Sequence, residues 1–176
     1  MGGTCIFFTG LSGAGKTTLA ERLRDVLTPT YGYVSLIDGD VVRALSGTLS
    51  FTKEDRDLNV RRVGMLACEI VQHGGIVICA MIAPYEDVRQ AIAGTIRQHG
   101  DFVLVYVATP LAVCEERDVK GLYARARAGE IQHFTGIDDP YEVPQDPDVI
   151  IDTTNREPLE SLTPLVVRLC GKGVSK

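Results

Sequence analysis

The sequence predicts an α/β protein, a three-layer sandwich in which helices cover both faces of a five-stranded parallel sheet. Three observations predict this class. Short apolar runs recur along the chain, these runs do not alternate with polar residues, and segments with helical spacing separate them. A length of 176 residues, with 45% hydrophobic and 23% charged residues, is typical of one globular domain spanning 1–176.

Each expected element can be justified from its own residues. Continuous apolar runs are typical of strands buried on both faces, and we expect strands at 5–8, 34–37, 76–82, 102–107 and 148–152. Apolar residues at helical spacing predict helices at about 16–27, 54–73, 85–98, 111–117 and 157–169. In such a fold, ligands are expected at the carboxyl ends of the strands.

The segment from about 117 to 147 departs from this pattern, because it is mixed in charge and has no sustained apolar period. Loops of this length in a compact domain are usually functional or disordered. Its first part is basic, with Arg117, Lys120, Arg125 and Arg127. We expect a lid that closes over phosphates and excludes water, the alternative being a solvated insertion.

The stretch Gly10–Thr17, GLSGAGKT, matches the pattern G-x-x-x-x-G-K-[ST] between an expected strand and an expected helix. Its three glycines let backbone N–H groups converge on an anion, and the following helix adds the positive end of its dipole. Lys16 can reach the β- and γ-phosphates, and the Thr17 hydroxyl can bind Mg²⁺. The sequence therefore predicts a nucleoside triphosphate site.

Two carboxylates follow the second strand in Asp38-Gly39-Asp40. Phosphoryl transfer to an alcohol requires a carboxylate near Mg²⁺ and one that orients or deprotonates the hydroxyl. Asp40 alternatively caps a helix, so Asp38 is the stronger catalytic candidate. No acidic residue ends the run 76–82, which assigns the metal-side role to Asp38 as well.

A second anion site is expected on the helix at 54–73. Arg56 and Asn59 share a helical face with apolar residues that should meet the core, namely Val63, Leu66, Ala67 and Ile70. An arginine on an inward face requires an anion. Together with Arg43, Arg56 therefore predicts an anion site opposite the glycine-rich loop. The alternative is that these arginines form ordinary salt bridges.

Two phenylalanines, Phe51 and Phe134, lie in polar segments of a chain with few aromatic residues. Stacking on a nucleobase and simple packing as a staple or lid anchor are both open from the residues alone.

The bulk composition excludes several classes of protein. A net charge of −5 argues against general attraction to nucleic acid or anionic membranes, and no apolar run is long enough to span a bilayer. The five cysteines are scattered and lack a C-x-x-C pair, which suits a reducing cytoplasm.

Taken together, the chain resembles the adenylylsulfate (APS) kinase family. The resemblance rests on GLSGAGKTT, DGD with Arg43, FTKEDRDLNVRR, the Ala-Pro-Tyr turn, PLAVCEERDVKGLYARARAGEI and FTGIDDPYEVP, which span residues 4 to about 153. It implies a P-loop NTPase fold of the nucleoside-monophosphate-kinase type. It also implies transfer of the ATP γ-phosphoryl group to the 3′-hydroxyl of APS, giving PAPS and ADP with Mg²⁺.

The resemblance also implies roles for individual residues. Those implied for ATP are Gly10, Ser12, Gly13, Ala14, Gly15, Lys16, Thr17, Thr18 and Arg117. Those implied for APS are Asp38, Asp40, Arg43, Phe51, Arg56, Asn59, Ile82, Ala83, Lys120, Gly121, Leu122, Phe134 and Thr135, with the two phenylalanines sandwiching its adenine. Lys16, Asp38 and Asp40 are the implied catalytic residues, and Thr17 and Asp38 the implied metal ligands. Members of the family usually form dimers, so a homodimer is implied, and functional association with ATP sulfurylase is left open.

Three positions depart from the family pattern. Where the family commonly has a serine associated with a phosphoenzyme, this chain has Ala83, so we expect direct in-line transfer. Glu86 replaces a frequent arginine and is expected to weaken APS binding if its side chain points into the site. Val41 replaces a usual asparagine.

Two other functions are kept as alternatives. One is a related P-loop kinase of another small alcohol, such as a sugar or an antibiotic. The other is a catalytically weak, nucleotide-binding regulatory domain. A GTPase switch is disfavoured because the chain lacks the guanine-reading motif N-K-x-D.

Overall fold

The computed structural model describes residues 2–47 and 51–171 and contains one parallel sheet with the strand order β2-β3-β1-β4-β5. The strands are β1 (Thr4–Thr9), β2 (Val34–Asp38), β3 (Ile76–Ala80), β4 (Asp101–Val107) and β5 (Val149–Ile151). All five expected strands are confirmed, and so is the three-layer α/β class.

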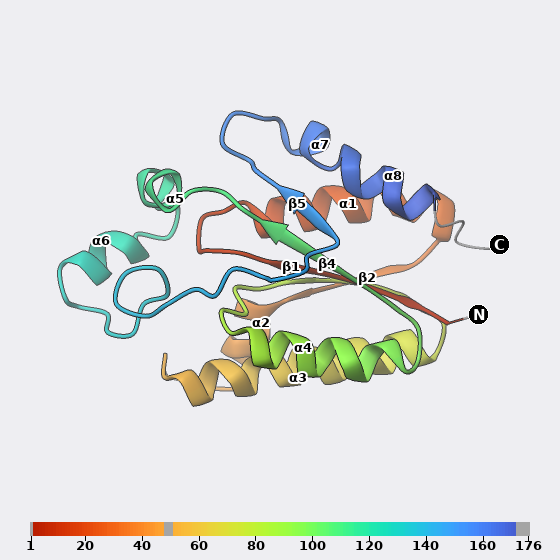
Figure 1. Ribbon diagram of the computed structural model, residues 1–176, viewed down its shortest axis with the longest axis horizontal. Helices are drawn as coiled ribbons and strands as arrows, with labels where there is room; N and C mark the ends of the chain where they lie inside the picture. The colour runs from red at the N-terminus through yellow and green to blue at the C-terminus, as the bar shows by residue number, and fades with distance from the viewer. Residues whose placement is uncertain (1, 48–50, 172–176) are drawn as a thin grey trace.

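Helices cover both faces of the sheet. Figure 1 shows α1 (Lys16–Tyr31), α7 (Pro158–Ser161) and α8 (Thr163–Gly171) on one side. On the other side lie α2 (Gly39–Leu45), α3 (Lys53–Gln72) and α4 (Glu86–Arg97), while α5 (Leu111–Arg117) and α6 (Leu122–Arg127) lie at one end. None of the helices in the described residues is long and apolar enough to cross a membrane.

The alternation of side chains along β1 divides the core into two layers. Ile6 and Phe8 belong to the apolar cluster that includes residues of α1 and α8. Cys5 and Phe7 point the other way, into the cluster formed with α3 and α4. Because β1 is buried throughout and central in the sheet, the loop that follows it starts from a fixed point.

Several helices differ from expectation. Helix α6 was not predicted, a helix following Asp38-Gly39-Asp40 was considered only as an alternative, and the expected helix at 157–169 is divided into α7 and α8. On α3, Leu66 was expected to face the core, but it is 50% exposed. Gly64 occupies the inward position instead, since a Cβ there would come within 2.6 Å of Ile92, and the buried face continues through Val60 and Val63.

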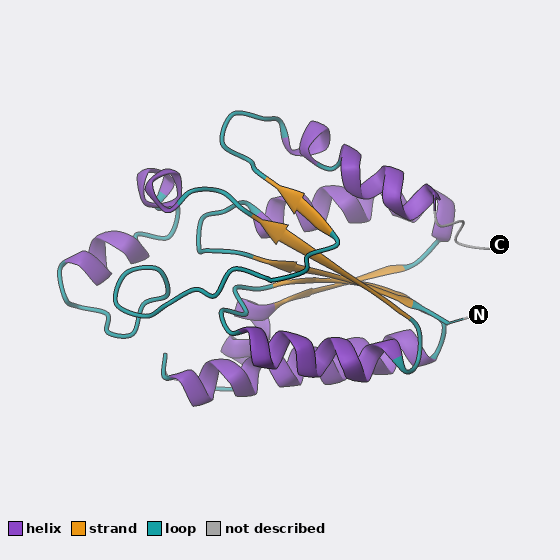
Figure 2. Cartoon of the chain, in the orientation of Figure 1, coloured by secondary structure: helices purple, strands orange, loops and turns teal. Residues whose placement is uncertain are grey.

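The 117–147 segment, called the lid segment below, lies beyond the carboxyl ends of the strands (Figure 2). It is not a solvated insertion, because Tyr123, Ala126, Ile131 and Phe134 are buried in the same apolar cluster as α1. The Tyr123 hydroxyl donates to the carbonyl oxygen of Ser12 at 2.9 Å, so the segment rests directly on the glycine-rich loop.

Candidate active site

The glycine-rich loop has the backbone conformation that its sequence predicts. Gly10, Gly13 and Gly15 have φ values of 153°, 74° and 97°. Gly13 and Gly15 lie well inside the left-handed region that side chains disfavour. A Cβ on Gly10 would lie 2.6 Å from the carbonyl oxygen of Val107, so the loop passes too close to β4 for any other residue. Helix α1 begins at Lys16, which leaves its N-terminal N–H groups beside this loop.

Lys16 is buried, and its ammonium donates to the carbonyl oxygen of Leu11 at 2.7 Å. Burial lowers the pKa of Lys16 to about 8, against the opposing attraction of Asp40. No carboxylate in the described part of the chain forms an ion pair with this buried ammonium, which leaves it suited to an incoming anion. The N-terminus of α1 favours the same charge.

Asp38 lies between the glycine-rich loop and α2. Its Oδ2 accepts a hydrogen bond from the Thr17 hydroxyl at 2.9 Å, and its Oδ1 accepts from the backbone N–H of Asp40 at 2.8 Å. Asp38, and not Asp40, is therefore the cap of α2. Asp40 is exposed and forms an ion pair with Lys120 of the lid segment, so the two carboxylates have different surroundings.

The inward face of α3 carries two polar groups with unmet hydrogen-bonding capacity. Arg56 and Asn59 are 4% and 2% exposed. Arg56 Nη1 forms an ion pair with Asp139 at 3.1 Å, and Asn59 Nδ2 donates to the carbonyl oxygen of Gly39 at 3.0 Å. Arg56 Nη2 and Asn59 Oδ1 are buried and have no partner within the described residues. Unpaired buried polar atoms destabilise the protein unless a ligand or water satisfies them.

Two phenylalanines lie at this site, Phe51 and Phe134. The guanidinium of Arg43 lies 4.9 Å from the centroid of the Phe51 ring, which is 40% exposed. Phe134 is 3% exposed and meets Tyr123 edge-on, with 5.0 Å between ring centroids. Phe134 therefore anchors the lid segment in the core, and it also borders the cavity described next.

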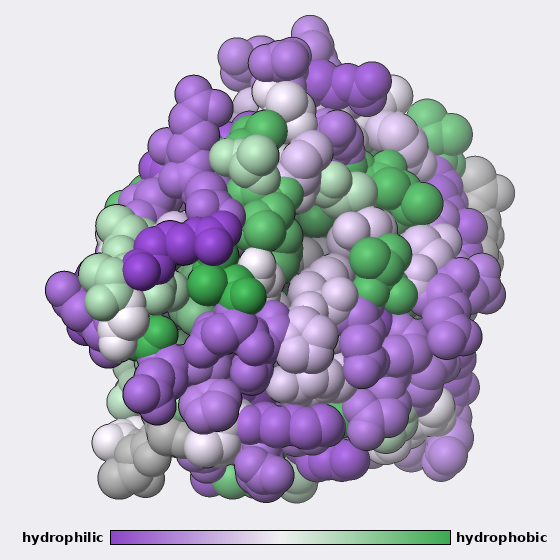
Figure 3. Space-filling model, turned by 60° about the vertical axis from the view of Figure 1, so that its left-hand side comes forward, coloured by the Kyte–Doolittle hydropathy of each residue, from purple (hydrophilic) through white to green (hydrophobic). Residues whose placement is uncertain are grey.

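These groups surround one cavity of about 430 Å³ at the carboxyl ends of the strands. On the face seen in Figure 3, hydrophilic residues predominate and hydrophobic ones form small patches. The expected site residues that line the cavity are Ser12, Gly13, Gly15, Lys16, Thr17, Thr18, Asp38, Asp40, Arg43, Phe51, Arg56, Asn59, Ile82, Ala83, Lys120, Leu122, Phe134 and Thr135. The expected residues outside its lining are Gly10, Ala14, Arg117 and Gly121.

Arg117 instead lies behind the glycine-rich loop. Its Nη1 donates to the hydroxyl of Thr153 at 2.8 Å and to the carbonyl oxygen of Gly13 at 3.3 Å, and its Nη2 donates to the carbonyl oxygen of Thr153. The hydroxyls of Thr153 and Thr109 lie 2.8 Å apart, each within 3.1 Å of the carbonyl oxygen of Ala14. These contacts brace the loop from behind; the two threonines were not anticipated from sequence.

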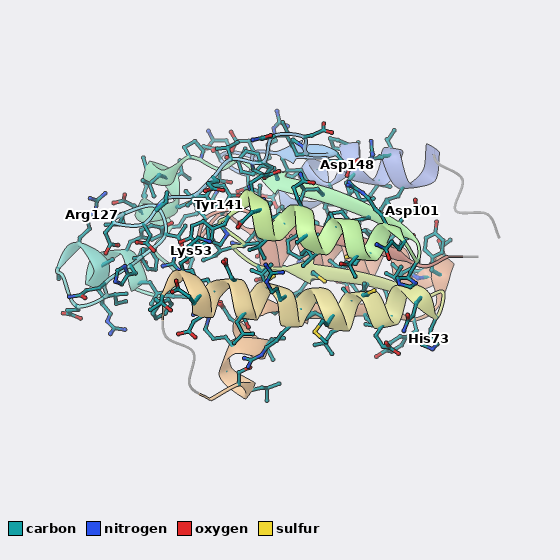
Figure 4. All side chains as sticks on the ribbon, turned by 60° about the horizontal axis from the view of Figure 1, so that its bottom comes forward. Lys53, His73, Asp101, Arg127, Tyr141 and Asp148 are labelled. Carbon is teal, nitrogen blue, oxygen red and sulfur yellow. The ribbon has the colours of Figure 1, made fainter. Side chains whose placement is uncertain are left out.

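The other arginines of the lid segment do not face the cavity. Arg125 pairs with Glu130 and Arg127 with Glu115, and both arginine side chains are more than half exposed. Arg127 lies at the outer edge of the molecule in Figure 4. Of the four basic residues Arg117, Lys120, Arg125 and Arg127, Lys120 alone lines the cavity. The lid segment therefore places less positive charge at the cavity than its sequence predicts.

Comparison with known proteins adds independent information. The family model described as Adenylylsulphate kinase matches residues 2–152. An adenylyl-sulfate kinase of Gloeothece citriformis is 50% identical, over 95% of this chain and 94% of the relative. An adenylyl-sulfate kinase of Halothermothrix orenii is 49% identical, over 97% of this chain and 91% of the relative.

Solved structures agree with this. The Mycobacterium tuberculosis APS kinase CysC, solved in complex with AMPPNP and APS, has a TM-score of 0.90 and 38% identity, covering 96% of this chain and 98% of that chain. The hexameric APS kinase of Thiobacillus denitrificans has a TM-score of 0.77 and 40% identity, covering 99% of this chain but 30% of that longer chain.

Proposed function

This chain belongs to the adenylylsulfate kinase family, and from that membership we propose that it transfers the γ-phosphoryl group of ATP to the 3′-hydroxyl of adenylylsulfate. The products are PAPS and ADP. The reaction breaks the bond between the γ-phosphorus and its bridging oxygen and forms a new bond to the ribose oxygen, whose proton leaves.

One observation carries the proposal beyond family membership. Arg56 Nη2 and Asn59 Oδ1 are a donor and an acceptor without partners among the described residues, and both side chains line the cavity. Adenylylsulfate offers an anionic phosphosulfate to the arginine and hydroxyl or amino donors to the amide oxygen. A substrate with this mixed chemistry satisfies both atoms at once.

ATP is proposed to bind on the opposite wall. Its phosphates would lie against the N–H groups of the glycine-rich loop and the ammonium of Lys16, with Thr18 beside them and Arg117 as the brace behind. Gly10 and Ala14 act through the backbone path of the loop. The adenylylsulfate residues proposed are those expected from the sequence, with Lys120, Gly121 and Leu122 on the lid side and Ile82, Ala83 and Thr135 on the walls.

Asp38 is the proposed catalytic carboxylate, since it adjoins both Thr17 and the cavity. It would orient the 3′-hydroxyl and accept its proton, while Lys16 stabilises charge on the transferred group and Asp40 positions Lys120. Thr17 and Asp38 present oxygen donors side by side, which suits Mg²⁺. When bound there, Mg²⁺ would neutralise charge on the phosphates.

We infer direct in-line transfer, because Ala83 has no hydroxyl that an intermediate phosphorylation would need. Glu86 was expected to weaken substrate binding only if its side chain points into the site. The Glu86 carboxylate does not line the cavity. It accepts hydrogen bonds from Arg89 and Gln90, so its charge is neutralised within α4.

We also propose a homodimer in the cytoplasm. Leu58, Met65 and Leu66 form an exposed apolar stripe on the outer face of α3, with Met65 at 74% exposure. Such a stripe supports burial against a second copy. Functional association with an ATP sulfurylase would supply the adenylylsulfate.

The test is release of ADP from ATP and Mg²⁺ with and without adenylylsulfate. We expect release that depends on adenylylsulfate and saturates with it. Turnover of another small alcohol, with none of adenylylsulfate, would replace the proposal with a kinase of that alcohol. Binding of ATP without turnover of either would indicate a regulatory domain.

A further inference from the structure

Residues 81–85 connect β3 to α4. Ile82, Ala83 and Pro84 within this connection line the cavity, and their three successive carbonyl oxygens are all hydrogen-bonded. The carbonyl oxygen of Ile82 accepts from the Thr9 hydroxyl at 2.6 Å. That of Ala83 accepts from Arg89 Nη1 at 2.6 Å, and that of Pro84 from the backbone N–H of Glu142 at 2.9 Å.

All three contacts lead to the end of the lid segment. The Thr9 hydroxyl has one proton, which it donates to Ile82, so the Tyr141 hydroxyl 2.9 Å away donates to Thr9. Arg89 Nη2 donates to the carbonyl oxygen of Glu142 at 2.6 Å. Figure 4 shows Tyr141 close to the beginning of α4. The wall of the cavity and the base of the lid segment, Tyr141–Glu142, are thus held together along three routes.

Arg89 is the central group of this connection. It is 1% exposed, and its guanidinium reaches two backbone carbonyls and the carboxylate of Glu86. Burial alone would raise the pKa of Glu86, but hydrogen bonds from Gln90 and Arg89 outweigh it and lower that pKa. A planar guanidinium can serve three acceptors in fixed directions, which a lysine ammonium cannot do from the same stem.

The held turn is strained. Ala83 has a φ of 43°, in the left-handed region that residues with a Cβ rarely adopt. A residue stays in this region only where its surroundings enforce it. The contacts of the Ile82, Ala83 and Pro84 carbonyls are the ones that enforce it here.

We propose that Arg89 is a positioning residue for the phosphoryl acceptor. It fixes the turn at Ala83 and the base of the lid segment as one unit, so that the cavity wall has the shape the acceptor requires. This inference rests on the proposed function insofar as the acceptor is adenylylsulfate. Arg89 itself does not line the cavity and acts through Ala83.

The test compares Arg89→Lys with Glu86→Gln. Both variants weaken the buried ion pair and should lower the melting temperature. Only Arg89→Lys disturbs the carbonyls of Ala83 and Glu142, so we expect it to raise the KM for adenylylsulfate about tenfold, with the KM for ATP little changed. Glu86→Gln should keep the wild-type KM values. Equal KM values in wild type and Arg89→Lys, or equal increases in both variants, would overturn the proposal.

Hydrogen–deuterium exchange gives a readout that needs no substrate. In Arg89→Lys, amide exchange should rise in residues 82–85 and 139–143 together, and in Glu86→Gln it should rise less. If exchange rises in only one of these segments, the turn at Ala83 and the base of the lid segment are not held as one unit, and the proposal is contradicted. If Arg89→Lys does not fold, Tyr141→Phe removes one route without changing the side-chain volume, and it should raise exchange in both segments. A wild type without activity on adenylylsulfate would refute the proposed function while this result still decides the role of Arg89.

Discussion

Asp38→Asn separates the chemical role of this carboxylate from its structural role. An asparagine retains an oxygen for the backbone N–H of Asp40, which now lies at 2.8 Å, and asparagine and aspartate are comparable helix caps. Its amide N–H can donate to the Thr17 oxygen, which reverses the present 2.9 Å hydrogen bond without breaking it. The remaining loss is a negative charge at the N-terminus of α2, so the free energy of unfolding should fall by about 1 kcal/mol or less.

Catalysis should respond very differently. A neutral amide cannot take the proton of the attacking hydroxyl, and loss of a general base lowers turnover by about 10²- to 10⁴-fold. At about 1.4 kcal/mol for each tenfold change, this is about 3–6 kcal/mol of transition-state stabilisation. The effect on turnover should therefore exceed the effect on stability several-fold.

The assay is steady-state ADP release with saturating substrates, alongside calorimetric titration of ATP and a thermal melt. We expect ATP binding largely intact and a melting temperature near that of the wild type. Asp87→Asn is the matched control, because Asp87 is an exposed carboxylate in the first turn of α4 and does not line the cavity. Turnover of Asp38→Asn within threefold of the Asp87→Asn control would remove Asp38 from the chemistry.

Three further predictions follow from single contacts. Phe134→Leu keeps an apolar side chain beside Tyr123 but removes the ring, so it should raise the requirement for adenylylsulfate more than that for ATP; equal effects would refute stacking. Thr153→Val removes the hydroxyl that braces the glycine-rich loop and should raise the KM for ATP about threefold to tenfold, while Thr154→Val, which loses only a contact to a neighbouring carboxylate, should not. Because the pKa of Glu86 is lowered in the folded state, its charge stabilises the protein above the ordinary pKa of 4.5, and this contribution is lost as the pH falls through the folded pKa. The difference in free energy of unfolding between wild type and Glu86→Gln, measured by denaturant titration, should therefore shrink on acidification. A difference that stays constant with pH would contradict a stabilising role for the Glu86 charge.

The sheet and the glycine-rich loop could be predicted because both are local patterns. A buried parallel strand shows as a continuous apolar run, and the loop has glycines where the backbone requires them. The inward direction of Arg56 and Asn59 also followed from helical spacing alone. The same rule applied to α4 would have singled out Arg89, which shares its buried face with Ile92 and Ile96.

What could not be predicted depends either on patterns too short to recognise or on contacts distant in sequence. Helix α6 has six residues and depends on the backbone N–H groups of Tyr123 and Ala124 meeting Asp118, too short a pattern for apolar periodicity to reveal. Arg127 was assigned to phosphates by its charge, but it is paired with Glu115, twelve positions earlier. Thr153 carries no pattern of its own, and its role comes from meeting the loop over a separation of 139 residues.

The most direct measurement is a crystal structure with ADP and adenylylsulfate bound. We expect the ribose 3′-hydroxyl within hydrogen-bonding distance of Asp38 and directed at the position of the missing terminal phosphate. Arg56 Nη2 and Asn59 Oδ1 should then both contact the sulfonucleotide. A bound sulfonucleotide that leaves these two atoms without contact, or that directs its 3′-hydroxyl away from the glycine-rich loop, would contradict the two-sided site on which the proposed transfer depends.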